Sequence, residues 1–134
     1  MMMHTTTDLM ENPRFRDLIE GFSEVIKTSA EQGLDAARQR CTAFFLSADD
    51  FRAEVESIQR FEIEGKDLNR IPLRAYKPKA EQPLPVIVYF HRGGWIFGSN
   101  EESDPVCRLL ASELQCVVVA VEYRLAPEHP FPQP

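Results

Sequence analysis

Hydrophobic positions follow a helical period in the first third of the chain. Asn12 suits an N-cap and Pro13 the first helical position, so a helix is predicted to start there. The spacing predicts one apolar stripe, formed by Phe15, Leu18, Ile19, Phe22, Val25 and Ile26. A second helix is predicted from about Leu34 to Leu46, with one face formed by Leu34, Ala37, Cys41, Phe44 and Phe45. Core packing is the simplest role for both stripes, and the alternative is a cap that borders a substrate pocket.

The hydrophobic period changes near Glu54. Apolar or small residues then alternate with mostly charged neighbours, at Val55, Ser57, Gln59, Phe61 and Ile63, which predicts a half-solvated strand. Residues 65–69 predict a turn, and the alternation of Ile71, Leu73 and Ala75 predicts the return strand of an antiparallel hairpin. Pro72 favours an edge position or a strand start.

Two continuous apolar runs follow, Val86 to Phe90 and Cys116 to Val121. A helix is predicted between them, with Asp104 as N-cap, Pro105 at the first position, and an inward face of Val106, Leu109, Leu110 and Leu114. Strand, helix and strand at this spacing predict a βαβ unit with parallel strands. Strands without alternation are typical of a sheet whose two faces are both covered.

The predicted fold class is therefore α/β, with a hairpin followed by one βαβ unit. We expect a disordered tail over residues 1–11, two helices within residues 12–50, and the first part of an α/β domain over residues 51–134. A sheet that stops after one βαβ unit has a bare growing edge, which is an aggregation hazard. The expectation is an incomplete fold, either truncated or completed by another chain that supplies its C-terminal half.

Composition narrows the class of protein. The 134 residues are 43% hydrophobic and 27% charged, with a net charge of −6, which is typical of a soluble globular domain. The absence of a Lys/Arg cluster argues against a nucleic-acid partner or a stable membrane anchor. The first residues lack the features of a signal peptide. The three cysteines, Cys41, Cys107 and Cys116, predict reduced, buried thiols and a cytoplasmic location. No metal site and no cofactor are indicated.

The segment with candidate chemistry begins where the first apolar run ends, at His91-Arg92-Gly93-Gly94-Trp95. Glycines after a buried strand let the backbone turn sharply and leave N–H groups that suit a negative charge. The glycines at 93, 94 and 98 match neither G-x-G-x-x-G nor G-x-x-x-x-G-K-[ST], so a phosphate cradle is disfavoured. A plain tight turn without a ligand remains an alternative at this point.

Two longer stretches resemble the α/β-hydrolases of the hormone-sensitive-lipase type. Residues 85–99 are similar to the family's H-G-G-G-W loop, and residues 117–132 are similar to its D-Y-R-L-A-P-E-H-P-F-P-A segment. Residues 71–78 also look like the family's second strand, so the resemblance covers about residues 54 to 134. It implies the N-terminal portion of an α/β-hydrolase sheet, preceded by two cap-like helices. It also implies a carboxylic ester hydrolase whose partner is a small-molecule acyl ester.

The resemblance assigns roles position by position. Gly93 and Gly94 match the glycines whose N–H groups form the oxyanion hole. His91 matches a histidine that shapes the loop, and Arg92 and Trp95 are expected to help shape it. Trp95 is expected to serve as pocket wall or in packing rather than in chemistry. The second motif supplies residues expected to hold the loop from behind, namely Tyr123, Arg124 and Glu128, for which surface ion pairing is the alternative.

Three departures from the family pattern qualify the resemblance. Arg92 replaces the first loop glycine and would strain the backbone if this position needs positive φ; the alternatives are a cation directed toward the pocket and a side chain that lies in solvent. Glu122 replaces an aspartate. The chain also contains no G-x-S-x-G, so no catalytic residue is expected in it, and the Ser-Asp-His triad is expected beyond Pro134. Three hypotheses follow: an esterase or lipase-like hydrolase, a non-catalytic ligand-binding relative comparable to the plant gibberellin receptors, or an inactive truncated product.

Overall fold

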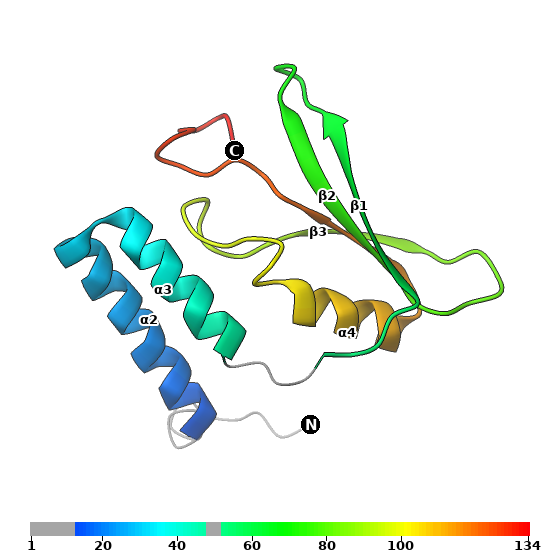
Figure 1. Ribbon diagram of the computed structural model, residues 1–134, viewed down its shortest axis with the longest axis horizontal. Helices are drawn as coiled ribbons and strands as arrows, with labels where there is room; N and C mark the ends of the chain where they lie inside the picture. Colours follow the sequence, from blue (N-terminus) through cyan, green and yellow to red (C-terminus); the bar gives the residue numbers. More distant parts are fainter. Residues whose placement is uncertain (1–12, 48–51) are drawn as a thin grey trace, which may run out of the picture. The chain divides into compact units, whose positions relative to one another are not determined.

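The computed structural model describes residues 13–47 and 52–134. The chain divides into two compact units, one up to Phe45 and one from Leu46 onward, and each is described by itself (Figure 1). The predicted tail over residues 1–11 and the predicted cap Asn12 lie outside the described residues.

The first unit is a pair of helices, as predicted. Helix α2 spans Pro13–Gln32 and helix α3 spans Leu34–Ser47. Gly33 separates them with a φ of +89°, a conformation that favours glycine. The Ala37 N–H donates to the Gly33 carbonyl at 3.2 Å at the start of α3. The helical periodicity of the sequence therefore located both helices and the turn between them.

Packing within this unit explains the glycine inside α2. A Cβ atom at Gly21 would overlap the ring of Phe44, so the missing side chain lets α3 approach α2 closely. The Phe45 ring contacts Phe22 edge-on at a centroid distance of 5.6 Å. Ala37 and Cys41 are buried on the predicted face of α3.

The expectation that the α2 stripe is core is only partly met. Val25 is buried, whereas the other stripe residues whose side chains are described are 37–67% exposed: Leu18, Ile19, Phe22 and Ile26. A helical period shows that a helix has an apolar face, but it does not show what covers that face.

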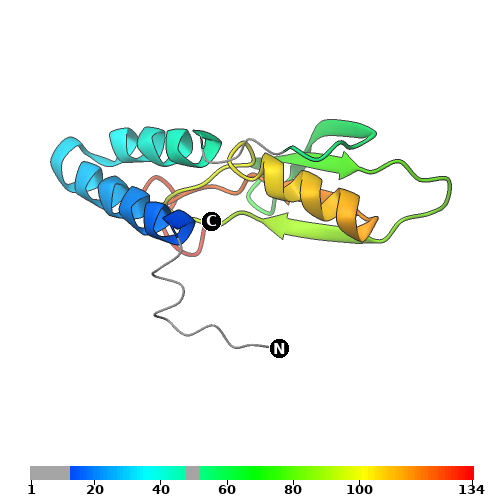
Figure 2. The ribbon, with the colours of Figure 1, turned by 90° about the horizontal axis from the view of Figure 1, so that it is seen from below.

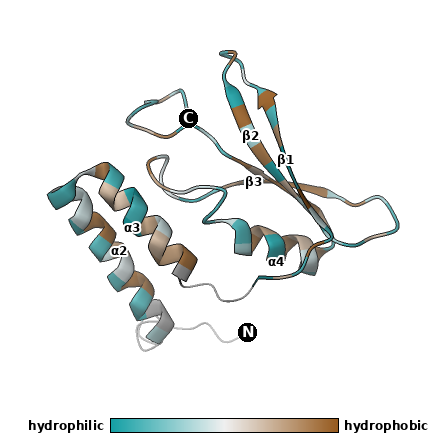
Figure 3. Ribbon diagram, viewed as in Figure 1, coloured by the Kyte–Doolittle hydropathy of each residue, from teal (hydrophilic) through white to brown (hydrophobic). Residues whose placement is uncertain are grey.

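The second unit begins with the predicted hairpin. Strand β1 spans Ser57–Glu64 and strand β2 spans Arg70–Lys77, paired antiparallel in register from Ser57↔Lys77 to Glu64↔Arg70. Figure 3 shows hydrophobic and hydrophilic residues alternating along β2. The strand is not an edge strand, because β4 pairs with its other side. Pro72 is tolerated because the β2–β4 ladder starts only at Leu73↔Val121.

The predicted βαβ unit completes the sheet. Strand β3 spans Val86–Phe90, helix α4 spans Asp104–Leu114 and strand β4 spans Val117–Val121. Strands β3 and β4 are parallel, and the sheet order is β1-β2-β4-β3, so the sheet is mixed. Helix α4 lies along one face of this sheet (Figure 2). The predicted α/β architecture of residues 57–121 is confirmed.

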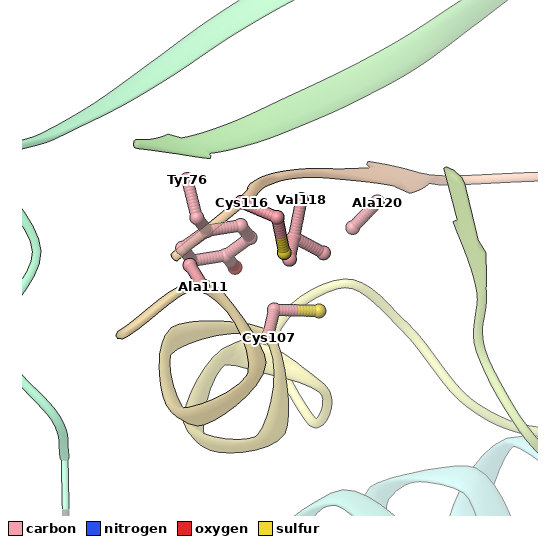
Figure 4. Packing of buried hydrophobic residues seen from close by; sticks show 6 residues of the cluster. All are labelled: Tyr76, Cys107, Ala111, Cys116, Val118 and Ala120. Carbon is pink, nitrogen blue, oxygen red and sulfur yellow. The ribbon is translucent and has the colours of Figure 1, made fainter. Parts of the chain in front are cut away.

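The core of the second unit lies between α4 and the sheet (Figure 4). Its buried members come from both layers: Tyr76, Cys107, Ala111, Cys116, Val118 and Ala120. The predicted inward face of α4 is confirmed in part: Val106 and Leu110 pack against this core, whereas Leu109 and Leu114 are 40% and 57% exposed, and Cys107 and Ala111 are fully buried instead. Small residues let the helix sit close to the β-branched strand β4. The N-cap prediction was also displaced by one residue, since Ser103 is the cap and Asp104 is inside the helix.

The sequence predicted that both faces of β3 would be covered, but its face opposite α4 is exposed. Val86, Val88 and Phe90 are 61%, 57% and 64% exposed in the described part of the chain. Cys41, Cys107 and Cys116 are buried, and none of them forms a disulfide within the described residues, as predicted. Neither α2, α3 nor α4 combines the length and the apolar composition needed to cross a membrane.

Candidate functional site

Strand pairing brings the two motif segments together. The parallel register ends at Phe90↔Val121, so His91 and Glu122 leave the same edge of the sheet side by side. Carboxyl ends of adjacent parallel strands are where α/β sheets place their ligand-binding loops. Residues about thirty positions apart in sequence therefore meet because the crossover that contains α4 brings β4 back beside β3.

The loop after β3 is closed by its own backbone. The N–H groups of Ile96 and Phe97 donate to the Gly93 carbonyl at 3.1 and 2.9 Å. Gly93 has a φ of +130°, and a Cβ atom there would overlap the Phe97 carbonyl. Gly98 has a φ of +96°, and a Cβ atom there would overlap the Arg92 carbonyl and the His91 ring. Only glycine fits at these two positions.

The amides of Gly93 and Gly94 remain available for a ligand. Neither donates a backbone hydrogen bond to the described residues. Gly94 has a φ of +60° and open space where a Cβ atom would lie. Two adjacent unpaired N–H groups at a strand end can stabilise an oxyanion, provided that the backbone around them is held fixed.

His91 fixes one side of the loop. Its side chain is fully buried, its Nδ1 donates to the Arg92 carbonyl at 2.9 Å, and its ring stacks on Tyr123 at a centroid distance of 4.1 Å. Its Nε2 lies 4.0 Å from the Glu122 Oε1 and makes no hydrogen bond to the described residues. This burial suits the loop-shaping role expected for His91 and leaves its ring out of reach of a substrate.

The segment after β4 braces the loop from behind. The Tyr123 hydroxyl donates to the His91 carbonyl at 2.7 Å. Burial, and then the neighbouring Glu122 carboxylate, raise the pKa of Tyr123, so its hydroxyl stays protonated and able to donate. Glu122 accepts a hydrogen bond from the Asn100 N–H at 2.7 Å, and the Asn100 amide group donates to the Ala120 carbonyl at 3.3 Å. Both ends of the loop are thereby tied to β4.

Arg92 does not strain the loop. Its φ is not positive, and the non-glycine loop residue with positive φ is instead Trp95, at +64°. Of the three outcomes considered for Arg92, backbone strain from positive φ is therefore excluded. The Trp95 carbonyl accepts a hydrogen bond from the Ala126 N–H at 2.8 Å, which links the two motif segments again.

A cavity of about 450 Å³ opens beside the two glycine amides. Its walls are largely aromatic, and Arg92 supplies a cationic group to them. The residues that line it are Phe90, His91, Arg92, Gly93, Gly94, Trp95, Tyr123 and Pro134. Trp95 is 65% exposed and forms wall rather than core. Within the described residues, no group of three or more potential ligands could hold a metal ion.

The structure directs the Arg124 side chain away from the loop. The Arg124 guanidinium contacts the Asp67 carboxylate at 3.0 Å in the β1–β2 turn and donates to the Gln133 carbonyl at 2.9 Å. Glu128 is exposed. For Arg124, the alternative of a surface ion pair describes the observed contacts better than a brace on the loop.

Three residues of the site were not identified from the sequence, namely Gly98, Asn100 and Glu122. Glu122 was noted only as a replacement within the second motif. A signal for Gly98 existed, because a third glycine shortly after a glycine pair is typical of a tightly closed loop. The contact between Asn100 and Glu122 depends on strand register and has no local sequence signal.

Comparison with known proteins places this geometry in context. The model of a family described as the alpha/beta hydrolase fold matches residues 87–134. The chain is 37% identical over 127 residues to the carboxylesterase NlhH of Mycobacterium tuberculosis, covering 90% of this chain and 37% of that protein. It is 42% identical over 62 residues to an arylesterase of Saccharolobus solfataricus, covering 46% of this chain and 20% of that protein.

The solved structures that resemble this chain also include ester hydrolases. An ester hydrolase from the metagenome of Lake Arreo superposes with a TM-score of 0.74 at 32% identity, covering 92% of this chain and 41% of that chain. An arylesterase structure superposes with a TM-score of 0.77 at 29% identity, covering 91% and 40%. The chain thus spans well under half the length of the relatives that it matches.

Proposed function

We propose that this chain belongs to the α/β-hydrolases of the hormone-sensitive-lipase type, and that the protein is a carboxylic ester hydrolase to which this chain contributes the oxyanion loop. The observation that carries the proposal is the pair of unpaired amides at Gly93 and Gly94 beside an aromatic cavity. When a nucleophile attacks an ester carbonyl, the oxygen gains negative charge. Two fixed N–H donors stabilise that charge most strongly in the transition state.

The residues around the loop hold these donors in place. Tyr123 fixes the His91 carbonyl, and Glu122 fixes the Asn100 amide at the other end of the loop. Donors that are held before the reaction starts need no reorganisation as the charge develops. We expect loss of either contact to lower kcat more than it raises KM.

The reaction also needs a nucleophile and a base, which this chain does not provide in the family's G-x-S-x-G form. His91 is buried and engaged by the Arg92 carbonyl, so it is not placed to act as a base. We therefore expect the 134-residue chain alone to show no turnover of an activated ester. The proposed substrate is a small-molecule ester, which is hydrolysed once a nucleophile and a base complete the site.

A chimera tests the proposal. It joins this chain to the part of the carboxylesterase NlhH that follows the matched stretch, and hydrolysis of p-nitrophenyl acetate is measured. Removing one oxyanion donor costs about 10²–10³ in kcat, so an intact loop should keep the chimera within about a hundredfold of NlhH. The chain alone and the NlhH part alone serve as controls and should be inactive.

The same measurement also distinguishes the hydrolase proposal from the alternative of a non-catalytic, ligand-binding relative. In the chimera the nucleophile and base come from an enzyme, so a failure of catalysis would lie with the loop of this chain. A chimera that unfolds cooperatively and binds an ester, yet falls more than about a thousandfold below NlhH, contradicts the hydrolase proposal and supports the receptor-like alternative.

A further inference from the structure

The two glycine donors of the loop are held through the carbonyl oxygens of their own peptide groups. Each of these peptide groups is planar and trans, so its C=O and N–H point in opposite directions. The Gly94 N–H shares a peptide group with the Gly93 carbonyl, which accepts two hydrogen bonds from within the loop. The Gly93 N–H shares one with the Arg92 carbonyl, which accepts from the His91 Nδ1 at 2.9 Å. The His91 ring therefore acts on the Gly93 donor through a single peptide group.

Both nitrogens of the His91 ring lie beside hydrogen-bond acceptors. Nδ1 meets the Arg92 carbonyl, and Nε2 lies 4.0 Å from the Glu122 Oε1 and has no hydrogen-bond partner among the described residues. A neutral imidazole carries one proton, so either neutral tautomer leaves an unprotonated nitrogen beside an acceptor oxygen. The imidazolium, which carries a proton on each nitrogen, is the form that offers a donor to both acceptors.

Three contacts offset the cost of placing a charge on this buried ring. The His91 side chain is fully buried, and burial by itself disfavours a charged group. The Glu122 carboxylate supplies the opposite charge at 4.0 Å, and the Arg92 carbonyl accepts a charge-assisted hydrogen bond. The Tyr123 ring stacks on the imidazole at a centroid distance of 4.1 Å and an interplanar angle of 14°, within the range of a cation–π contact.

Resting on the proposed function, we propose that Glu122 holds His91 as an imidazolium and that this charge strengthens the Gly93 donor of the oxyanion hole. The Nδ1–H bond draws electron density toward the Arg92 carbonyl oxygen, and hydrogen bonds that form a chain polarise one another. The Gly93 N–H, at the other end of the same peptide group, therefore donates more strongly to a developing oxyanion. His91 and Glu122 are positioning residues, because they act through this peptide group.

The other charged groups near this pair are mostly engaged elsewhere. Glu122 and Tyr123 face the His91 ring from the segment after β4, and Arg92, on the loop of His91 itself, meets the ring through its carbonyl. Glu122 also borders two surface cavities, and the charged residues that line them with it are Lys66, Asp67, Arg124, Arg60, Glu62 and Arg74. Most of these form ion pairs of their own, whereas Lys66 and Arg60 are exposed, so salt screens their charge. The contact with the buried His91 ring is screened much less.

Imidazole ¹⁵N signals of the chain itself test the charge on His91 without any catalysis. His4 and His129 are replaced by glutamine, so that His91 gives the only imidazole signals. Long-range ¹H–¹⁵N spectra distinguish an imidazolium, with two protonated nitrogens, from a neutral ring, with one. At pH 7 we expect two protonated nitrogens in this chain and one in its Glu122→Gln variant, because a neutral side chain no longer favours the charged ring. Glu62→Gln removes the same charge from a residue of the same cavity and should leave the signals unchanged.

The chimera with NlhH links this charge to catalysis. In Glu122→Gln the side-chain oxygen can still accept from the Asn100 N–H, so the loop keeps its tie to β4. Charge-assisted hydrogen bonds are roughly twice as strong as neutral ones, so we expect kcat for p-nitrophenyl acetate to fall about fivefold at pH 7, with KM unchanged. In the unmodified chimera kcat should decline at high pH as His91 loses its second proton, and in Glu122→Gln the decline should begin at lower pH. Tyr123→Phe should keep the decline, which excludes ionisation of Tyr123 as its cause.

The possible failures are distinguishable. One protonated nitrogen in the chain at pH 7, or identical signals over pH in the chain and in Glu122→Gln, refutes the charge pair and leaves the proposed function standing. Equal kcat values in the chimera and its Glu122→Gln variant refute the effect on the Gly93 donor. If His91 carries two protons but the chimera is folded and inactive, the charge pair stands and the proposed function fails.

Discussion

Substituting Gly93 and Gly94 by alanine, one at a time, should have very different consequences although the two residues are adjacent. Both have positive φ, at +130° and +60°. A Cβ atom at Gly93 would overlap the Phe97 carbonyl, whereas a Cβ atom at Gly94 would meet nothing within 4 Å. The pair therefore separates backbone strain, which both variants share, from a steric conflict that only Gly93→Ala creates.

The expected magnitudes follow from these contacts. Gly94→Ala should cost about 1–2 kcal/mol of stability, the usual cost of an L-residue in the left-handed region. Gly93→Ala carries about 1–3 kcal/mol of backbone strain. It must also displace the Phe97 carbonyl, which disturbs the hydrogen bonds that Ile96 and Phe97 donate to Gly93. At about 1 kcal/mol for each bond, the total reaches about 3–5 kcal/mol.

The assay is urea unfolding of both variants, together with amide hydrogen exchange at Ile96 and Phe97. We expect these two amides to lose most of their protection in Gly93→Ala and to keep it in Gly94→Ala. Equal destabilisation of the two variants, or unchanged protection in Gly93→Ala, would refute the account of how this loop is closed.

Three further predictions concern the surroundings of the loop and the core. Tyr123→Phe removes the 2.7 Å hydrogen bond to the His91 carbonyl and keeps the ring, so the free energy of unfolding should fall by about 1 kcal/mol, and no change would show that the bond contributes nothing. Asp104→Asn weakens ion pairs of a buried carboxylate with three arginines, Arg52, Arg74 and Arg108, and should cost about 2–3 kcal/mol in urea unfolding. The exposed Asp35→Asn should cost less, and equal effects would contradict this reasoning. Burial raises the pKa of the Cys107 thiol from 9.0 to about 12, so stability should decline as pH rises from about 9 toward 12, because the unfolded chain ionises first. Iodoacetamide at pH 8 should label Cys107 only on unfolding, and rapid native labelling would contradict its burial.

The fold of the second unit was largely predictable because its signals are local. Alternation, turn residues and continuous apolar runs each depend on a few neighbouring positions, and they located β1 through β4 closely. The inward face of α4 was predicted only in part, because the choice of Cys107 over Leu109 depends on how closely the helix approaches β4. Such a choice belongs to three-dimensional packing, which periodicity does not encode.

In the candidate site, too, local features were predictable from the sequence, whereas contacts between distant residues were not. The glycine pair marked the loop in the sequence, and the resemblance of residues 117–132 to a known segment pointed to Tyr123. The contacts of Glu122 with Asn100 and His91 follow from the register Phe90↔Val121, which no sequence pattern specified. Strain at Arg92 was expected only if its position needed positive φ, and the loop places positive φ at Trp95 instead, which the sequence did not indicate.

The claim that Gly93 and Gly94 donate to an oxyanion can be tested by removing a single N–H. In the chimera with NlhH, replacing the Gly94 amide by a backbone ester deletes the donor and leaves side chains and φ unchanged. The same replacement at Gly98, in the same loop, is the matched control. The account predicts that kcat for p-nitrophenyl acetate falls by about 10²–10³ at Gly94, with little change in KM and a much smaller effect at Gly98. Equal kcat values for the two replacements would contradict it.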